Sequence, residues 1–296
     1  MSESASLDRL PKPQSKTMPA ATPLISVGMT TYNRPEFLKQ ALEGVLGQTY
    51  TNLEVIVSED CTPCERTKAL LAEYAKQDSR VRPFHQPTNI GPPANFQFVL
   101  KQARGDYFFW ADDDDLRDPT WVEVLFRKLT TEDAVVAFSN LACIDLDGKV
   151  LRRFRPLQFS GSRTVRLARY FLSEAAEGKA NLVCGLYRTS FLRGIKHWGE
   201  YRRSLLAVDV LFVLDILRHG NALVDPSVTL YKRMGIGKGV PVKSAGDLFR
   251  RFRKELRQDL ACIGVADRWI DKTVLFLLIP LKLVRNLLYR VALLPR

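Results

Sequence analysis

From Pro23 onward, apolar stretches of strand length alternate with amphipathic stretches of helix length. The predicted strands are residues 24–29, 53–58 and 107–111. One helix is predicted to open at Asn33, with Pro35 in its first turn, a second covers residues 94–103, and a third is capped by Asp118 and Pro119. This alternation predicts βαβ units, and therefore an α/β fold with a mostly parallel sheet and flanking helices.

The second half departs from this pattern. Asp147 and Gly148 stand between two short strand-like stretches, a combination typical of a two-residue hairpin turn. We therefore expect antiparallel pairing at this point of the sheet.

The composition is that of a globular protein, but the charge is unevenly distributed. Of 296 residues, 46% are hydrophobic and 26% charged, which excludes a largely disordered chain or a coiled coil. The net charge is +12, and residues 229–296 hold 15 basic and 5 acidic side chains. Such a field indicates a phosphate-rich partner: an anionic membrane surface, a nucleic acid or a nucleotide.

The cysteines and the N-terminal segment suggest a reducing compartment. Five cysteines, an odd number, do not predict a disulfide framework. Cys61 and Cys64 form a CxxC pair, but no second pair stands nearby to complete a zinc site. Residues 1–22 lack the apolar core of a signal peptide, and we expect a disordered leader there.

Four successive carboxylates follow the predicted strand over residues 107–111. Asp112 to Asp115 repel one another, and a bound divalent cation would relieve that repulsion. Oxygen ligands favour Mg²⁺ or Mn²⁺, and ligands of open α/β sheets bind at the carboxyl ends of strands. The alternative is a solvated acidic loop.

Polar side chains also follow the other two predicted strands. They are Thr30, Thr31, Tyr32, Asn33 and Arg34 after the first strand, and Glu59 and Asp60 after the second. An aromatic ring can stack on a nucleobase, and a carboxylate can accept hydrogen bonds from base N–H groups or ribose hydroxyls. Taken singly, Asn33 is more simply a helix cap, and Glu59 with Asp60 the start of a turn.

These segments stand in the order and spacing of a known family. Residues 23–129 resemble the nucleotide-binding half of family 2 glycosyltransferases with the GT-A fold. The resemblance implies a nucleotide-sugar site formed by Thr30, Tyr32, Asn33, Arg34, Asp60, Asn95, Asp112, Asp113, Lys232 and Arg233. It implies that Asp60 binds the base, that Asp113 lies nearest the ribose, and that Asp114 holds the metal together with Asp112. Glu59 and Cys61 stand where the family often has Asp and Gly, which leaves the base open.

The resemblance continues more weakly in the second half. Residues 204–226 resemble the family's catalytic helix, which implies that Asp209 is the general base, although Val208 stands where an acid is usual. Asp209 and Asp215 interrupt an apolar helix, as a functional group or a structural ion pair would.

Two further features of this half are candidates for ligand contacts. Lys232 and Arg233 end another strand, where the family often places a basic residue near the diphosphate; surface charge is the alternative. Trp198 is a candidate for stacking on an acceptor sugar, although a packing tryptophan is more common.

Together these features and the resemblance predict a metal-dependent glycosyltransferase, and the resemblance implies that the enzyme is inverting. It would use Mn²⁺ or Mg²⁺ to move a sugar from a nucleotide-sugar, expected to be a UDP-sugar, to a hydroxyl of a glycan or lipid-linked acceptor in polysaccharide or glycolipid synthesis. The expected domains are the leader, a GT-A domain over residues 23–243 with a nucleotide-binding half (23–130) and an acceptor half (131–243), and a basic helical region over residues 244–296. Two alternatives remain: a non-catalytic, membrane-attached relative that binds a nucleotide or glycan, and a sugar-phosphate nucleotidyltransferase, which would want a Gly-rich loop after the first strand.

The C-terminal region predicts contact with a membrane surface. Read as a helix, residues 271–296 place Lys282, Asn286 and Arg290 on a narrow polar stripe, with Arg285 beside it, opposite a broad apolar face. Pro280, Lys282 and Arg285 interrupt the apolar stretch too early for a membrane-spanning helix. Residues 250–257 add five basic residues against one acid, which suits anionic headgroups. We expect peripheral attachment at the cytoplasmic membrane face and no nucleic-acid partner; packing of the apolar face on the domain, or a homodimer, is the alternative.

Overall fold

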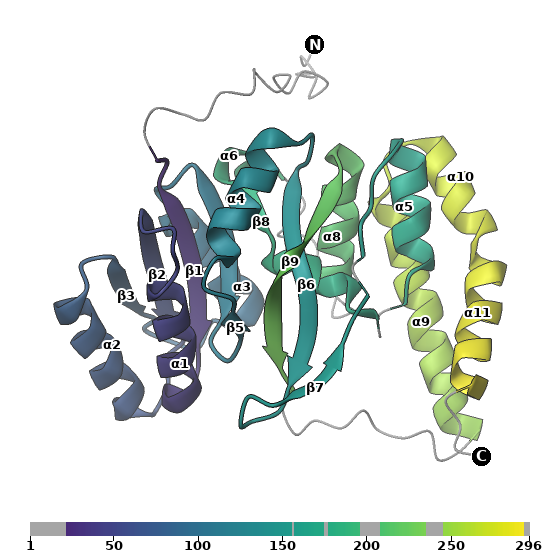
Figure 1. The fold of residues 1–296 in the computed structure, drawn as a ribbon. Coiled ribbons are helices and arrows are strands. Elements are labelled where there is room, and N and C mark those ends of the chain that lie inside the picture. Colours follow the sequence, from purple (N-terminus) through teal and green to yellow (C-terminus); the bar gives the residue numbers. More distant parts are fainter. Residues whose placement is uncertain (1–21, 156, 175–176, 196–207, 235–244, 293–296) are drawn as a thin grey trace, which may run out of the picture.

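The computed structural model describes residues 22–155, 157–174, 177–195, 208–234 and 245–292. Within them, one nine-stranded sheet is flanked by helices on both faces (Figure 1). Its strands are β1 (Ile25–Thr31), β2 (Leu53–Glu59), β3 (Val81–His85), β4 (Tyr107–Asp112), β5 (Leu116–Arg117), β6 (Val136–Ile144), β7 (Val150–Arg153), β8 (Leu186–Arg188) and β9 (Ala222–Arg233). Their order is β3-β2-β1-β4-β8-β6-β9-β5, and β7 pairs with β6.

Four neighbouring strands, β3, β2, β1 and β4, are parallel, which confirms the predicted parallel sheet. Thr30 lies opposite both Ser58 of β2 and Asp112 of β4, so the ends of these three strands meet at one edge. Gly28 allows close packing against β1, because a Cβ atom there would lie 2.5 Å from the Phe108 ring and 2.7 Å from Val99. The register therefore brings the polar residues after each strand together.

The second half is mixed, as the sequence indicates. Strand β8 is antiparallel to β4 and to β6, whereas β6 and β9 are parallel. Strands β6 and β7 do form an antiparallel pair, but the prediction of a two-residue turn is wrong. The connection is a longer loop than the predicted turn and covers residues 145–149, in which Gly148 has a φ of 86°. The Asp145 carboxylate stabilises this loop by accepting hydrogen bonds from the N–H groups of Asp147 and Lys149.

The helices on the two faces are α1 (Pro35–Leu46), α2 (Glu65–Gln77), α3 (Pro92–Gln102), α4 (Trp121–Thr131), α5 (Arg163–Leu172), α6 (Thr189–Gly194), α8 (Val208–His219) and the 3₁₀ helix η2 (Lys179–Cys184). Two predicted helix starts are wrong. Asn33 adopts a left-handed φ of 58° and α1 begins at Pro35. The Asp118 carboxylate accepts hydrogen bonds from the Thr229 N–H at 2.8 Å and the Tyr231 hydroxyl at 3.0 Å, so it joins β9 instead of capping α4.

Alternate residues of β4 divide the core between the two faces of the sheet. Phe108 and Trp110 pack on one face in a cluster that includes residues of α3, α5 and α8. Phe109 and Ala111 pack on the other face with residues of α1 and α4. Because all four side chains are fully buried, β4 is rigidly held up to the point where Asp112 begins the acidic run.

The C-terminal region forms α9 (Ala245–Val265), α10 (Trp269–Leu277) and α11 (Ile279–Ala292), where the sequence predicts one helix over residues 271–296. Figure 1 shows these helices stacked beyond α5 and α8, at the end of the molecule opposite α2 and β3. Lys282 and Asn286 are buried, whereas Leu281 and Val284 are exposed; the side chain of Arg290 lies outside the described part. In the part of the chain described, no helix is long and apolar enough to cross a membrane.

Candidate functional site

The acidic run at the end of β4 is neutralised from β9. The Lys232 ammonium lies 2.8 Å from an Asp112 carboxylate oxygen and 3.1 Å from an Asp115 oxygen, and the Arg233 N–H donates to Asp115 at 3.0 Å. Burial favours the neutral form of each group, but the attraction between the charges outweighs it for two of them, so the pKa of Lys232 is raised well above its usual value and that of Asp112 is lowered. For Asp115 burial prevails, and its pKa rises to about 6.

The middle of the run faces the loop after β1. The Arg34 guanidinium lies 2.7 Å from an Asp114 oxygen and 3.5 Å from an Asp113 oxygen. Burial is the main cause that raises the pKa of Asp113 to about 7, and the Asp114 and Asp112 charges add to it, while the Thr31 hydroxyl and Arg34 oppose it. The pKa of Asp114 is also raised, first by burial and then by Asp112. Burial, more than repulsion between the carboxylates, therefore favours the protonated form of both groups.

Arg233 holds the backbone of this loop. It is 5% exposed, its Nε donates to the Asp114 carbonyl at 3.0 Å, and its Nη2 donates to Gln40 Oε1 at 2.8 Å. It also donates to two carbonyls of the β6–β7 connection and lies 4.7 Å above the Phe37 ring. Because its guanidinium makes hydrogen bonds to these carbonyls and to Gln40, Arg233 fixes the position of the acidic run.

The predicted base-binding residues lie along the same edge of the sheet. Asp60 is 4% exposed, and its carboxylate accepts hydrogen bonds from the N–H groups of Ile90 at 2.8 Å and Gly91 at 3.0 Å. Asn95 is 1% exposed; its Nδ2 donates to the Ser58 carbonyl at 3.2 Å, and its Oδ1 has no hydrogen-bond partner among the described residues. Asp60 thus joins the residues before α3 to the end of β2.

The loop after β1 presents its polar residues to solvent at this edge. Tyr32 is 48% exposed, and Thr30 is aligned with Asp112 in the sheet. Glu59 is fully buried and accepts hydrogen bonds from the Thr62 N–H and from His85 Nδ1. The Tyr32 ring is therefore available for stacking, whereas Glu59 is part of the loop's internal structure.

Asp209 lies in the first turn of α8 and is exposed. Its carboxylate accepts a hydrogen bond from the Val210 N–H at 2.9 Å, and no ion pair joins it to any other residue that the structure describes. Helix α8 ends where β9 begins, so its first turn points to the edge at which β4 and β9 end; contact between the Trp110 and Phe212 rings, 5.8 Å apart, ties α8 to β4.

The other candidates of this half differ in their surroundings. Asp215 is 1% exposed and forms an ion pair with Arg218, the structural alternative for an acid in this helix. Trp198 lies outside the described residues. Sequence reasoning missed Cys184, which ends η2 with its sulfur 3.9 Å from an Asp112 oxygen, and Gln40; neither carries a local pattern that points to the site.

A divalent cation fits the donor chemistry of this site, although in the described residues no three His, Cys, Asp or Glu side chains converge on one point. Mg²⁺ in phosphate-binding sites is commonly held by one or two carboxylates together with substrate phosphates. Asp114 offers such a carboxylate, with Arg34 as the cation beside it, and Asp112 offers a second, beside Lys232.

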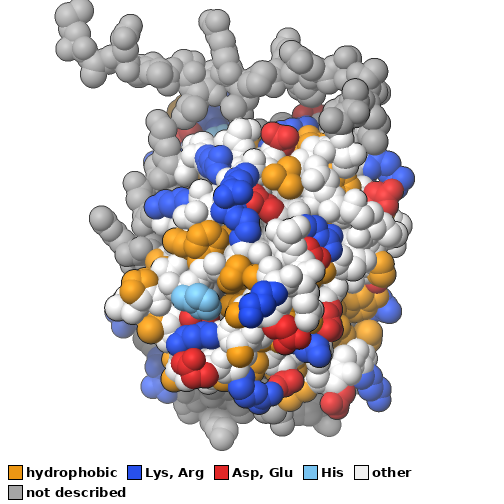
Figure 2. All heavy atoms as spheres, turned by 90° about the vertical axis from the view of Figure 1, so that its left-hand side faces the viewer, with side chains coloured by type: hydrophobic (Ala, Val, Ile, Leu, Met, Phe, Trp, Pro, Cys, Tyr) orange, Lys and Arg blue, Asp and Glu red, His pale blue; other side chains and the backbone are white. Residues whose placement is uncertain are grey.

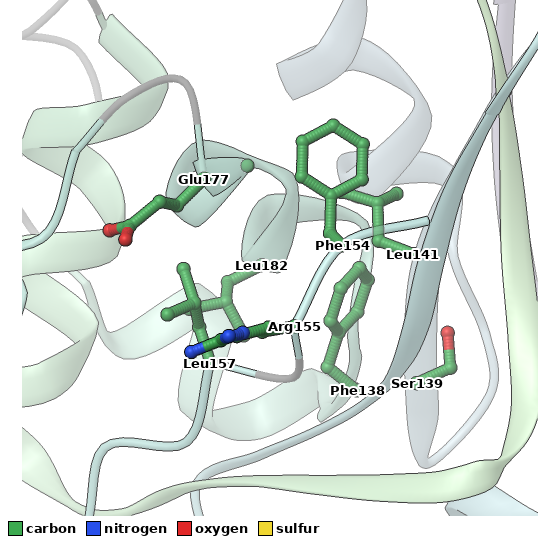
Figure 3. A pocket seen from close by; sticks show the side chains of 9 residues that line it. Phe138, Ser139, Leu141, Phe154, Arg155, Leu157, Glu177 and Leu182 are labelled. Carbon is green, nitrogen blue, oxygen red and sulfur yellow. The ribbon is translucent and has the colours of Figure 1, made fainter. Parts of the chain in front are cut away.

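A small apolar pocket lies apart from these residues, between β6, η2 and the segment after β7 (Figure 3). Figure 3 shows Phe138, Leu141 and Phe154 around it, with the Glu177 carboxylate directed away from the two phenylalanine rings. None of the residues lining this pocket is a candidate site residue.

Comparison with known sequences identifies a family. Residues 26–189 match the family model described as Glycosyl transferase family 2. An uncharacterized glycosyltransferase of Methanocaldococcus jannaschii is 30% identical over 154 residues, 51% of this chain and 52% of that protein. The match thus spans about half the length of this relative, and it spans the same share of an uncharacterized glycosyltransferase of Haemophilus influenzae.

Comparison with solved structures shows the same fold. S. aureus TarS 1-349 in complex with UDP-GlcNAc aligns with a TM-score of 0.56 at 20% identity, over 85% of this chain and 70% of that one. The mannosyltransferase PcManGT from Pyrobaculum calidifontis, in complex with GDP-Man and Mn²⁺, aligns with a TM-score of 0.52 at 15% identity, over 91% of this chain and 71% of that one. At these identities the likeness concerns the fold alone.

Proposed function

Because this chain belongs to glycosyl transferase family 2, we propose that it transfers a sugar from a nucleotide-activated donor to an acceptor hydroxyl, in one displacement with inversion at the anomeric carbon. One observation carries the proposal: the ends of β1, β2, β4 and β9 bring an exposed aromatic ring, carboxylates and two cations to one edge of the sheet. Ligands of open α/β folds bind at such an edge.

The donor would lie along this edge with its base toward β2 and its phosphates toward β4. Tyr32 would stack on the base, Asp60 and Asn95 would contact the nucleoside, and Asp113 would lie nearest the ribose. Support for a UDP-sugar comes from the solved TarS complex with UDP-GlcNAc, whereas PcManGT binds GDP-Man. Turnover of candidate nucleotide-sugars identifies the base.

In the displacement, Asp209 would accept the proton of the attacking hydroxyl. Its exposure and the absence of a described counter-ion leave the carboxylate accessible to an acceptor. Mn²⁺ or Mg²⁺, held by Asp114 with Asp112, would neutralise the charge that develops on the departing nucleoside diphosphate. Lys232 and Arg34 would add positive charge beside the phosphates, and Arg233 would keep the acidic run in place.

Two substitutions and one control test this assignment. Each candidate nucleotide-sugar is incubated with the protein and Mn²⁺, and release of the nucleoside diphosphate is measured with and without a metal chelator. Asp209→Asn should lower transfer by roughly 10² to 10⁴-fold and leave donor affinity unchanged. Asp114→Asn should abolish the metal-dependent part of nucleotide affinity, measured by calorimetry.

Asp133→Asn is the matched control, because it makes the same chemical change at an exposed position just before β6, at the opposite edge of the sheet. It should alter neither measurement. Transfer that persists within a few-fold in Asp209→Asn would show that another group is the base. Metal-dependent donor binding without turnover of any donor would favour the non-catalytic relative over the enzyme.

The acceptor is proposed to be a glycan or lipid-linked hydroxyl at the cytoplasmic face of a membrane, as in polysaccharide or glycolipid synthesis. The basic C-terminal region supports this location, since exposed cations of α9 include Arg253, Lys254 and Arg257.

A further inference from the structure

The outward faces of α10 and α11 are apolar. We call this surface the α10–α11 apolar face; it consists of Trp269, Ile270, Phe276, Leu277, Leu281 and Val284. The most accessible of them are Trp269, 76% exposed, and Leu277, 69% exposed. Single exposed apolar residues are normal on a protein surface, but six on two consecutive helices indicate a surface that has a partner.

Two charged residues of the same helices, Asp271 and Lys282, point inward and are paired there. Asp271 is fully buried, with its carboxylate 2.8 Å from Arg163 Nε. Lys282 forms an ion pair with Asp259 of α9 and lies 4.3 Å above the Phe171 ring of α5. These contacts fix the rotation of both helices, so the exposure of the apolar side is part of the folded structure.

The charge beside this face is positive. Arg268 and Lys272 are exposed next to it. Asp267, the exposed acid among the described side chains of α9 to α11, forms ion pairs with Arg163 and Arg218. The opposite end of the molecule differs, because Figure 2 shows basic and acidic side chains interspersed there.

We propose that the α10–α11 apolar face docks on an anionic lipid bilayer, which refines the membrane location proposed above. Apolar side chains would enter the boundary between headgroups and acyl chains, while Arg268 and Lys272 would meet the headgroup phosphates. A second copy of the chain fits less well, since a twofold dimer pairs a patch with itself and would bring these cations together.

This docking orients the catalytic half. Helix α8, which carries Asp209, packs against α5 and α9, and α10 packs against α5 and α9 in turn. Figure 1 places β3 and α2 at the far end of the sheet. The acceptor side of the site is therefore the side nearer the bilayer, and the predicted nucleotide side is the one nearer bulk water.

The test uses the full-length protein and liposomes of phosphatidylcholine with or without phosphatidylglycerol, at low and high salt. Wild-type protein should co-sediment with the anionic vesicles and dissociate at high salt. Phe276→Gln/Leu277→Gln/Leu281→Gln should lose binding to the anionic vesicles even at low salt. Arg268→Gln/Lys272→Gln should weaken binding to anionic vesicles by about fivefold per cation removed and leave binding to neutral vesicles unchanged.

Val150→Gln/Leu151→Gln on the exposed strand β7 is the matched control for loss of apolar surface. It should bind vesicles as the wild type does. Equal binding by the triple glutamine variant and the wild type would overturn the proposal, as would equal loss in the β7 control. A concentration-dependent dimer that the triple variant abolishes, without vesicle binding by the wild type, would assign the face to a second copy instead.

A second measurement does not depend on the triple variant folding. Vesicles with brominated acyl chains should quench tryptophan fluorescence of the wild type more strongly than that of Trp269→Phe; equal quenching would refute insertion of this face. Donor turnover in solution is measured on the same proteins. Vesicle binding without turnover would leave the docking surface standing while the proposed enzymatic function fails, and turnover without vesicle binding would do the reverse.

Discussion

Replacing Arg34 by Gln should raise the affinity for a divalent metal ion when no nucleotide is bound and lower it when a nucleotide is present. In the structure the guanidinium lies 2.7 Å from the Asp114 carboxylate that we propose as the metal ligand. Without nucleotide, a cation must displace Arg34 from this carboxylate. With a nucleoside diphosphate bound, the released guanidinium can contact the phosphates and help to hold them.

The size of the effect follows from the exposure of the pair. The Arg34 side chain is 53% exposed, and ion pairs open to solvent contribute about 0.2–1 kcal/mol. Removing this competition should tighten Mn²⁺ binding to the nucleotide-free Arg34→Gln protein by about 1.4- to 5-fold. In the presence of UDP, Arg34→Gln should instead weaken the ternary complex, because one charge beside the diphosphate is lost.

Titration of free Mn²⁺ by electron paramagnetic resonance at neutral pH, with and without UDP, measures both affinities directly. Arg66→Gln removes the same charge from an exposed pair with Glu36 on the surface and serves as the control. Equal shifts in the two variants would mean that only net charge matters. An Arg34→Gln protein with unchanged affinity in both states would refute the competition and, with it, the placement of the metal on Asp114.

Three further predictions concern other charged groups of the fold. Lys232→Met should lower the free energy of unfolding in urea by about 3 kcal/mol, because the buried Asp115 carboxylate loses its cation while Asp112 stays beside it. Asp115→Asn should restore much of that loss in the double variant, and additive effects of the two changes would contradict the pairing. Burial lowers the pKa of Lys179 to about 8 in the folded protein. Between pH 8 and 10.5 the unfolded chain therefore binds more protons than the folded one, and the free energy of unfolding should rise with pH. Lys179→Met should flatten this slope, and an identical slope in both proteins would contradict the prediction. Asp60→Asn should speed amide hydrogen exchange at Ile90 and Gly91, whose N–H groups the carboxylate binds, whereas Asp133→Asn should leave those amides unchanged.

The parts of the site that the sequence predicts are those that a local pattern determines. Apolar periodicity locates the strands, and the carboxyl ends of parallel strands lie at one edge, so the pattern predicts that the polar residues after these strands lie close together. The register that aligns Thr30 with Ser58 and Asp112 comes from the structure. The pairing of the remaining groups depends on residues far apart in the chain. Lys232 reaches Asp115 across 117 positions, and Arg233 reaches Gln40 across 193, distances over which periodicity carries no information.

The wrong start predicted for α4 has the same physical origin. Asp118 has a good capping side chain at a good capping position, but the backbone N–H of Thr229 and the hydroxyl of Tyr231 compete for the carboxylate. In the C-terminal region the sequence predicts both a polar stripe and an apolar face but not which one points inward. The ion pair of Lys282 with Asp259 decides that orientation, and it depends on how α9 is placed.

The carboxylates of the acidic run in the first half of the chain are neutralised by β9, which is synthesised much later. When β4 and the acidic run at its end have been synthesised, Lys232, which neutralises two of the four carboxylates, is still more than a hundred residues away. Long-range pairings of this kind form late, because the entropy cost of closing the loop comes before any contact compensates it. The isolated nucleotide half would therefore carry its carboxylates without Lys232 or Arg233. A chimera that exchanges donor specificity between relatives must take β9 from the same parent as β4.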